Sequence, residues 1–177
     1  MTKAEKEAIA SMVVVCDTRE QETPALKRRL KALKADFRRE ALKEGDYTCE
    51  YQKTDSNSLL RLPVVVERKM NLAELALCFT SERGRFEREM ERIKEKGLRA
   101  YLLIENASWE DIYDGNYRSQ MSPESLVGSL LAWSIRYGLH IIFCRSATTG
   151  KLIGDIFRHE VAEDLKRKDG EDHKTPF

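Results

Sequence analysis

A short stretch, Val64-Val65-Val66-Glu67-Arg68-Lys69, constrains the fold of this chain more than any other. Three β-branched apolar residues in a row predict a strand that is buried on both faces. Ending such a strand on charged residues is unfavourable unless the charges meet a partner, a ligand or water. On an extended backbone Glu67 and Lys69 project from the same face. A carboxylate beside an ammonium at the end of a buried strand is a candidate metal-dependent active site, and a structural ion pair is the alternative.

Length and charge narrow the class of protein. The chain has 177 residues, enough for one domain with a sizeable core. Charged residues make up 34% of the chain, but the net charge is only +1. This balance argues against a globally basic nucleic-acid-binding protein and leaves a local basic patch open. No stretch approaches the roughly 20 apolar residues that span a bilayer, and residues 1–11 lack the apolar segment of a signal peptide. We therefore expect a cytoplasmic protein.

The four cysteines and three histidines are scattered along the chain. They form no C-x-x-C pair, which argues against a zinc knuckle or a redox motif and predicts reduced, buried thiols. Any metal would then be held by carboxylates, and carboxylate oxygens favour hard ions such as Mg²⁺ or Mn²⁺.

Apolar periodicity predicts strands that alternate with helices. The expected strands are residues 12–16, 37–42, 47–53 (half-exposed), 59–69, 100–104 and 139–144. The expected helices are a short lead-in within 1–10, one that starts at Pro24 after the N-cap Thr23, and 71–78, 86–96, 123–137 and 150–166. The expected turn or loop segments are residues 55–58, 80–85 and 107–121.

This alternation predicts the α/β class, a three-layer α/β/α sandwich around a central mixed sheet. We expect an N-terminal lead-in over residues 1–11, a single domain over 12–168 and a polar tail over 169–177.

Three acidic residues fall at or beside strand ends: Asp17, Asp46 and Glu67. If the sheet brings these ends together, the carboxylates can hold a divalent cation, which offsets their mutual repulsion. Such an ion acidifies bound water and neutralises charge that develops on a phosphoryl oxygen. Lys69 would orient that water or stabilise the charge, and Arg19 and Arg68 suit phosphate contacts.

These residues also carry a family resemblance. Gly45-Asp46, followed by Glu67-Arg68-Lys69, resembles the Gly-Asp…Glu-Arg-Lys-x-x-x-Asp signature of the XPF family of structure-specific endonucleases. Residues 17–20, Asp-Thr-Arg-Glu, are similar to that family's first acidic motif. More broadly, the arrangement resembles the PD-(D/E)xK pattern of restriction-endonuclease-like enzymes. The similarity covers about residues 12–165.

The resemblance implies a restriction-endonuclease-like fold and a Mg²⁺- or Mn²⁺-dependent endonuclease that cleaves branched DNA, such as flaps, forks or junctions. The implied catalytic residues are Asp46, Glu67, Lys69, Asp17 and Arg68, and the implied metal ligands are Asp17, Asp46 and Glu67. The residues expected to contact DNA or support the site are Arg19, Glu20, Arg83 and Arg85.

The chain departs from the family pattern in two ways. Ala73 stands where the signature has its last aspartate, with Glu74 next to it. The tandem helix-hairpin-helix module that often follows this domain is not found, which predicts a stand-alone, bacterial or phage-type member. Two alternatives stay open: an inactive DNA-binding or dimerising member of the family, and a restriction or repair nuclease on duplex DNA. The resemblance also implies a homodimer.

Overall fold

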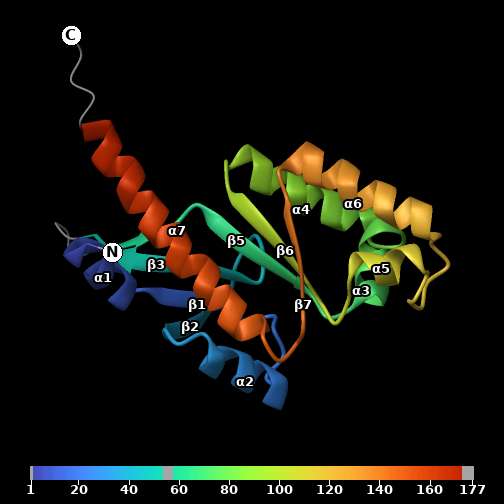
Figure 1. Ribbon diagram of the computed structural model, residues 1–177, viewed down its shortest axis with the longest axis horizontal. Coiled ribbons are helices and arrows are strands. Elements are labelled where there is room, and N and C mark those ends of the chain that lie inside the picture. Colours follow the sequence, from blue (N-terminus) through green and yellow to red (C-terminus); the bar gives the residue numbers. More distant parts are fainter. Residues whose placement is uncertain (1, 54–57, 173–177) are drawn as a thin grey trace, which may run out of the picture. The chain divides into compact units, whose positions relative to one another are not determined.

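The computed structural model describes residues 2–53 and 58–172. Its strands are β1 Val13–Asp17, β2 Asp36–Glu40, β3 Tyr47–Gln52, β4 Leu59–Arg61, β5 Val64–Lys69, β6 Arg99–Glu105 and β7 His140–Cys144 (Figure 1). Its helices are α1 Lys3–Ala10, α2 Pro24–Ala32, α3 Leu72–Phe79, α4 Arg83–Glu95, α5 Trp109–Tyr113, α6 Pro123–Tyr137 and α7 Thr149–Asp172.

The strands follow the hydrogen-bonded order β2-β1-β3-β5-β6-β7, and β4 pairs with β3. The β1–β2, β5–β6 and β6–β7 pairs are parallel, whereas β3 is antiparallel to β4 and β5. The predicted mixed sheet is therefore confirmed. The described residues form two compact units: the first comprises residues 2–41, 48–53, 58–62 and 150–172, and the second comprises 42–47 and 63–149.

In the first unit, helix α2 begins as its sequence predicts. The Thr23 side chain accepts a hydrogen bond from the Leu26 N–H at 3.1 Å, and Pro24 follows at the first helical position. The leucines of the apolar stripe, Leu26, Leu30 and Leu33, are all buried. Segment 36–40, whose sequence is ambiguous between helix and strand, is the predicted strand β2.

Strand β3 is buried on both faces, so the expectation of a half-exposed strand was wrong. Glu50 is only 8% exposed. Its carboxylate accepts hydrogen bonds from Arg38 at 2.7 and 2.8 Å and from Arg61 at 2.9 Å. These two guanidinium groups replace water around the carboxylate, so a polar residue on the outer face of the strand is buried with its charge satisfied.

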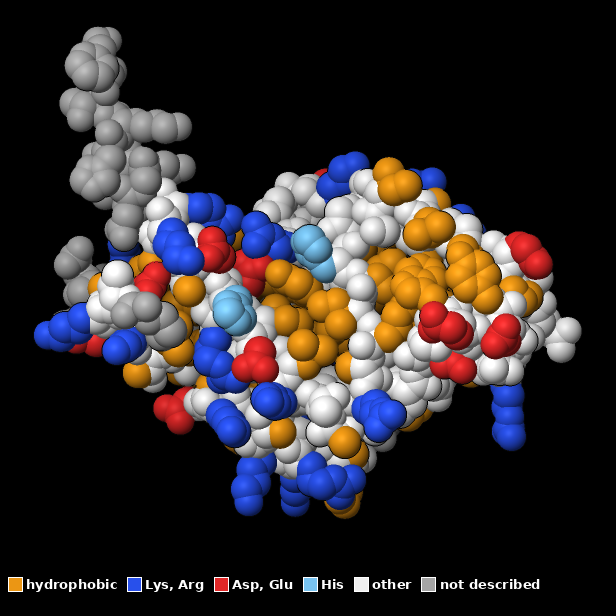
Figure 2. Space-filling view, viewed as in Figure 1, with side chains coloured by type: hydrophobic (Ala, Val, Ile, Leu, Met, Phe, Trp, Pro, Cys, Tyr) orange, Lys and Arg blue, Asp and Glu red, His pale blue; other side chains and the backbone are white. Residues whose placement is uncertain are grey.

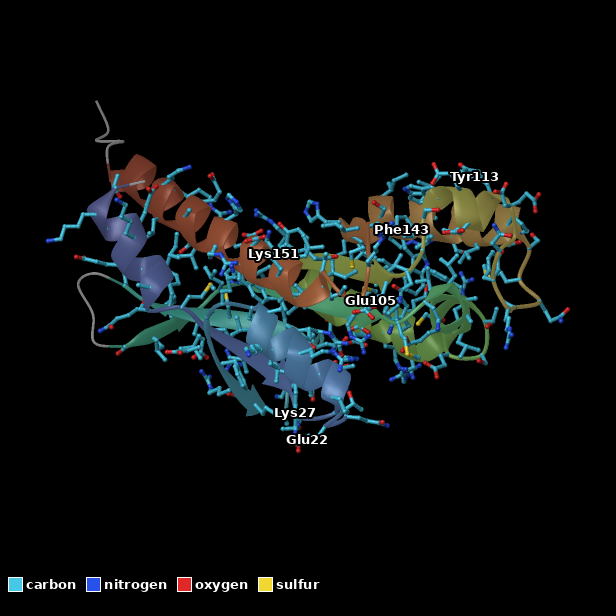
Figure 3. All side chains as sticks on the ribbon, turned by 60° about the horizontal axis from the view of Figure 1, so that its bottom comes forward. Glu22, Lys27, Glu105, Tyr113, Phe143 and Lys151 are labelled. Carbon is cyan, nitrogen blue, oxygen red and sulfur yellow. The ribbon has the colours of Figure 1, made fainter. Side chains whose placement is uncertain are left out.

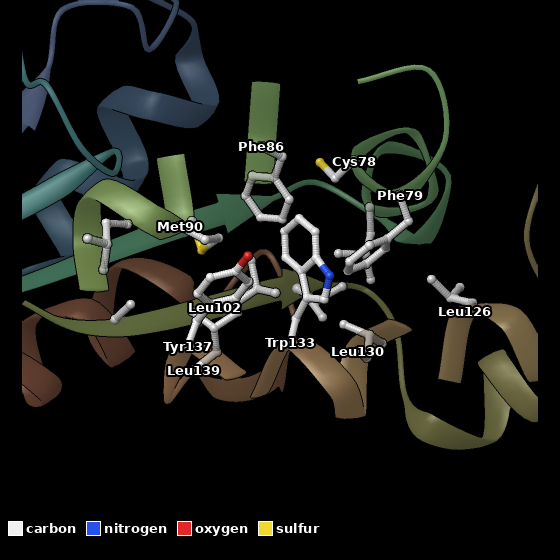
Figure 4. Close-up of a cluster of buried hydrophobic side chains, with 14 of the residues drawn as sticks. Cys78, Phe79, Phe86, Met90, Leu102, Leu126, Leu130, Trp133, Tyr137 and Leu139 are labelled. Carbon is white, nitrogen blue, oxygen red and sulfur yellow. The ribbon is translucent and has the colours of Figure 1, made fainter. Parts of the chain in front are cut away.

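The second unit packs its helices around an aromatic cluster (Figure 4). Phe86 of α4 stacks on Trp133 of α6 at a centroid distance of 5.1 Å, and Phe79 of α3 meets the same indole edge-on at 4.9 Å. Trp133 is 1% exposed, which makes it a core residue, while Ile135 is 85% exposed. Such aromatic pairs are favourable beyond the apolar area that they bury.

Several predicted boundaries were wrong. The strand expected over 59–69 is interrupted at Leu62-Pro63, where proline has no N–H for a ladder. Helix α4 already begins at Arg83 inside the expected loop, and the short helix α5 lies inside the segment expected to be irregular. Helix α7 continues to Asp172. Most of the turn expected at residues 55–58 lies outside the described residues.

Candidate active site

The end of β5 holds a buried ion pair. The Lys69 Nζ donates to Oε1 of Glu67 at 2.6 Å, and the two residues are 6% and 8% exposed. The same ammonium lies 5.0 Å from the centroid of the Phe86 ring, within the range of a cation–π contact. The pair therefore sits between the strand end and the aromatic cluster of the second unit.

Opposing effects act on Lys69. Burial lowers the pKa of the ammonium, but Glu67, together with Cys78 and Asp46, raises it, and the net pKa is above the ordinary value for lysine. Lys69 is therefore a fixed positive charge at neutral pH. The Asp46 carboxylate is hydrogen-bonded to the backbone N–H of Arg68, which stands between Glu67 and Lys69, so the structure brings these three predicted site residues to the same end of β5.

Asp46 is positioned by the backbone of β5. Its N–H donates to the Val66 carbonyl at 2.9 Å, and its Oδ2 accepts from the Arg68 N–H at 2.8 Å. Gly45 has φ +70°, and a Cβ there would lie 2.9 Å from the Val65 Cβ. A glycine is thus needed before Asp46, both for its left-handed backbone and for its close approach to β5.

Helix α4 anchors the segment that carries Asp46. The Gly45 N–H donates to Oε1 of Glu89 at 3.1 Å. Glu44 is 9% exposed and accepts from the Lys96 Nζ at 2.7 Å. These anchors were not predicted from the sequence, because Glu89 and Lys96 look there like ordinary polar positions of an amphipathic helix.

Arg68 is held in place by a buried acid rather than pointing freely outward. Its Nη1 donates to Oε2 of Glu105 at 3.2 Å, and the two side chains are 14% and 3% exposed. Glu105 ends strand β6, next to β5 (labelled in Figure 3). Arg68 thus supports the site in two ways, through its backbone N–H on Asp46 and through its side chain on Glu105.

Glu74, next to Ala73, is tied to the backbone at the start of helix α3. Its Oε2 accepts from the Met70 N–H at 2.6 Å, while its own N–H donates to the Asn71 side chain at 2.9 Å. Asn71 is thus the N-cap of α3, and the Glu74 side chain holds the backbone of the residue before that cap. The carboxylate that follows Ala73 is therefore engaged in local structure.

Asp17, Arg19 and Glu20 belong to the first unit. Asp17 is fully buried; its Oδ1 accepts from the Arg19 N–H and its Oδ2 from the Arg19 Nε, both at 2.8 Å. Glu20 pairs with Arg29 at 2.6 Å, with both side chains largely buried. Arg19 thus engages Asp17, while Glu20 is part of a packed ion pair.

Arg83 and Arg85 lie in the first turn of α4. Arg85 pairs with Glu82. Arg83 lines a groove of about 550 Å³ along α6, together with Ser125, Gly128 and Arg136 among others. The expectation that both residues lie on a loop was therefore wrong.

The donor set at the end of β5 fits a hard divalent cation. Within residues 2–53 and 58–172, no three His, Cys, Asp or Glu side chains are grouped so that they could hold a metal ion. Mg²⁺, however, is commonly bound by one or two carboxylates together with water and substrate phosphate. Asp46 and Glu67, both at the end of β5, offer two carboxylates for a site of that kind.

Comparison with known proteins identifies the family. The family model described as "ERCC4 domain" matches residues 16–156. A search of curated proteins found no significant match. Among the described residues, no helix is both long and apolar enough to cross a membrane.

Solved structures show the same fold. One is XPF from Aeropyrum pernix, with 22% identity and a TM-score of 0.60 over 88% of this chain and 69% of that chain. A second is XPF from Aeropyrum pernix in complex with DNA, with 20% identity and a TM-score of 0.58 over 86% and 66% of the two chains. These likenesses confirm the predicted three-layer α/β fold, and the chain belongs to the ERCC4 domain family.

Proposed function

We propose that this chain is a divalent-metal-dependent endonuclease that hydrolyses phosphodiester bonds in branched DNA. The observation that carries the proposal is that the Asp46 carboxylate is hydrogen-bonded to the backbone of β5 at Arg68, between Glu67 and Lys69, whose side chains form a buried ion pair. Two carboxylates and a lysine beside a strand end match the chemical needs of phosphodiester hydrolysis. The match to the ERCC4 domain model and the DNA complex formed by one structurally similar protein support a nucleic acid as substrate.

Asp46 and Glu67 would hold Mg²⁺ or Mn²⁺. When bound, the ion supplies Lewis-acid activation of water and neutralises charge on the phosphoryl group. Asp46 is oriented for this role by the Arg68 N–H, and Glu67 by Lys69. Asp17 belongs to the first unit, and its part as a third ligand stays a prediction from the sequence.

Lys69 supplies a permanent positive charge to the reaction. Its raised pKa keeps the ammonium protonated, so it stabilises negative charge in the transition state or orients the attacking water, and does not act as a general base. Arg68 is held by Glu105 and keeps the end of β5 rigid. The side chains of Glu67 and Lys69 therefore keep the positions that the reaction needs.

A homodimer is the second part of the proposal. In the second unit, α6 exposes Leu131 and Ile135, at 48% and 85%, and α5 exposes Tyr113 at 64%. Figure 2 shows hydrophobic side chains gathered over this α5–α6 region. Exposed apolar groups of this kind mark interaction surfaces. Sedimentation velocity of wild type and Ile135→Glu tests it: a dimer that the substitution dissociates is expected, and a wild-type monomer would exclude it.

Cleavage of a labelled panel of linear, flap, fork and junction DNAs with Mn²⁺ tests the catalytic proposal. Wild type should nick the branched substrates, and Glu67→Ala and Asp46→Asn should not. Glu91→Ala removes an exposed acid of α4 and serves as the matched control. Cleavage that survives loss of both Asp46 and Glu67 would sink the assignment. If wild type cleaves linear duplex as well as it cleaves the branched substrates, a restriction or repair nuclease is favoured. If wild type binds DNA without Mn²⁺ but cleaves none of the substrates, an inactive member of the family is favoured.

A further inference from the structure

Helix α2 carries charge of one sign only. Its sequence, Pro24 to Ala32, contains Lys27, Arg28, Arg29 and Lys31 and no acidic residue. Helix α4 is as rich in cations, but it interleaves four glutamates with them. A chain with a net charge of +1 therefore concentrates uncompensated positive charge on one short helix.

The cations of α2 divide between its two faces. Arg29 is turned inward, 9% exposed, and neutralised by Glu20. Lys27, Arg28 and Lys31, and Lys34 just beyond the helix, are exposed. Positions 27 and 31 lie on one side of a helix of 3.6 residues per turn, with 28 beside them, and Lys34 follows the C-cap Leu33. We call these four residues the α2 basic stripe.

Acidic neighbours do not neutralise the α2 basic stripe. In the described part of the chain, none of its four side chains forms an ion pair or a hydrogen bond. Glu22, which precedes the helix and is labelled in Figure 3, is paired with Arg39 at 2.7 Å. Figure 2 shows Lys and Arg side chains gathered over α2, at the bottom of the view. The positive charges of these four side chains therefore face solvent.

The stripe stands on a rigid platform within the first unit. A Cβ on Gly150 would lie 2.2 Å from the Arg29 carbonyl oxygen, and one on Gly154 would lie 2.3 Å from that of Leu33. These glycines of α7 let its backbone touch the end of α2 directly. Arg158 of α7 also donates to the Leu33 carbonyl at 3.0 Å. The end of α2 is thus fixed, which lowers the entropy lost when a ligand binds there.

Lys34 occupies a position that suits glycine better. It has φ +51° just after the C-cap Leu33, where helices usually end with glycine in the left-handed conformation. A lysine there is strained. The helix dipole can explain the presence of a cation near this end of the helix. It does not explain Lys27 and Arg28, which lie too far from that end.

We propose that the α2 basic stripe binds the phosphate backbone of a nucleic acid, outside the site at β5. This inference rests on the proposed function, because it assigns part of the path of the same DNA substrate. Within the helix, Lys27 to Lys31 spans about 6 Å at 1.5 Å per residue, and one DNA strand carries a phosphate about every 3.4 Å along the axis. The stripe therefore matches about three successive phosphates and reads no base sequence.

Fluorescence anisotropy with a labelled fork DNA in EDTA, over a series of salt concentrations, tests the stripe. The variant is Lys27→Gln/Arg28→Gln/Lys31→Gln in the full chain. Neutralising three phosphate contacts should reduce the slope of log K against log salt by about 2 to 3, and weaken binding at low salt by at least tenfold. Loss should be equal for forks of different base sequence, because backbone contacts carry no sequence information.

The matched control removes the same charge from the same unit. Lys3→Gln/Lys6→Gln/Lys166→Gln neutralises three exposed lysines, two of which pair with acids, Lys3 with Glu7 and Lys166 with Glu163. This control should keep the wild-type slope. Equal loss in the two triple variants would overturn the proposal, because net charge alone would then explain the effect.

Lys34→Gly guards against misfolding as the cause of weak binding. Glycine relieves the left-handed strain, so the urea midpoint should equal or exceed that of wild type while DNA affinity falls. If wild type binds the fork and both stripe variants bind it equally well, the stripe is excluded while the proposed function stands. If wild type binds no DNA, both fall together. Binding to anionic phospholipid vesicles is measured for wild type and for the stripe variants. If the stripe variants lose vesicle binding that wild type has, while their DNA binding is unchanged, the stripe is not a nucleic-acid surface.

Discussion

The ammonium of Lys69 lies 2.6 Å from Oε1 of Glu67, and both residues are almost fully buried at the end of β5. Removal of one partner from such a pair leaves an isolated buried charge and destabilises the fold by about 3–5 kcal/mol. We therefore expect Lys69→Met or Glu67→Gln to lower the free energy of unfolding strongly. Urea denaturation, followed by circular dichroism, measures it.

The double variant Glu67→Gln/Lys69→Met is the control for that prediction. It removes both charges, so its stability should lie closer to wild type than that of Lys69→Met alone, although cleavage is lost in all three. Additive losses in the double variant would show that the two groups do not depend on each other.

The backbone at Gly45 predicts a second effect on stability. Gly45→Ala adds left-handed strain and a contact of 2.9 Å with Val65. Gly97 has φ +63° and nothing within 4 Å of the added Cβ, so Gly97→Ala isolates the strain alone, about 1–2 kcal/mol. Gly45→Ala should exceed Gly97→Ala by about 1–3 kcal/mol because of overpacking, and should also impair cleavage through Asp46. Equal losses would contradict the close approach to β5.

Much of the site could be predicted from the sequence, because its groups follow local patterns. Glu67 and Lys69 share a face by strand alternation, and Gly45-Asp46 is a turn pattern in front of a strand. The anchors were invisible because the Gly45–Glu89 and Glu44–Lys96 contacts join residues 44 and 52 positions apart.

The fold was predicted to the extent that local signals exist. The cap Thr23 and the leucine stripe of α2 predicted that helix correctly. The start of α4 was missed because its N-cap, Glu82, makes no side-chain cap hydrogen bond. The burial of Glu50 was missed because it depends on Arg38 and Arg61, which come from other strands.

Glu74 gives a third prediction, on the missing family aspartate at Ala73. Glu74 needs only an acceptor oxygen for its hydrogen bond from the Met70 N–H. Glu74→Gln should therefore keep both stability and Mn²⁺-dependent cleavage, whereas Glu74→Ala should lower the free energy of unfolding by about 0.5–1.5 kcal/mol. If Glu74→Gln folds normally but loses cleavage, the carboxylate takes part in catalysis and replaces the signature aspartate.

Buried thiols and a buried phenol predict how stability depends on pH. Burial raises the pKa of Cys78 to about 11, with Lys69 opposing the shift. Burial, followed by Glu160 and other acids, raises the pKa of Cys49 well above its ordinary 9.0. Burial and the hydrogen bond to Asp164 raise the pKa of Tyr51 above 10.0. In each case the folded state holds its proton at a pH where the unfolded chain has lost it.

Because the unfolded state then binds fewer protons, stability falls as pH rises. It is fully retained below about pH 8, where unfolded thiols stay protonated, and each thiol then contributes a loss of up to about 1.4 kcal/mol per pH unit. Urea midpoints measured from pH 8 to pH 10.5 should decline, first from the cysteines and then from Tyr51. Cys78→Ala should decline less steeply than wild type over this range, and a flat midpoint up to pH 10.5 in wild type would show that these groups are not buried in the folded protein.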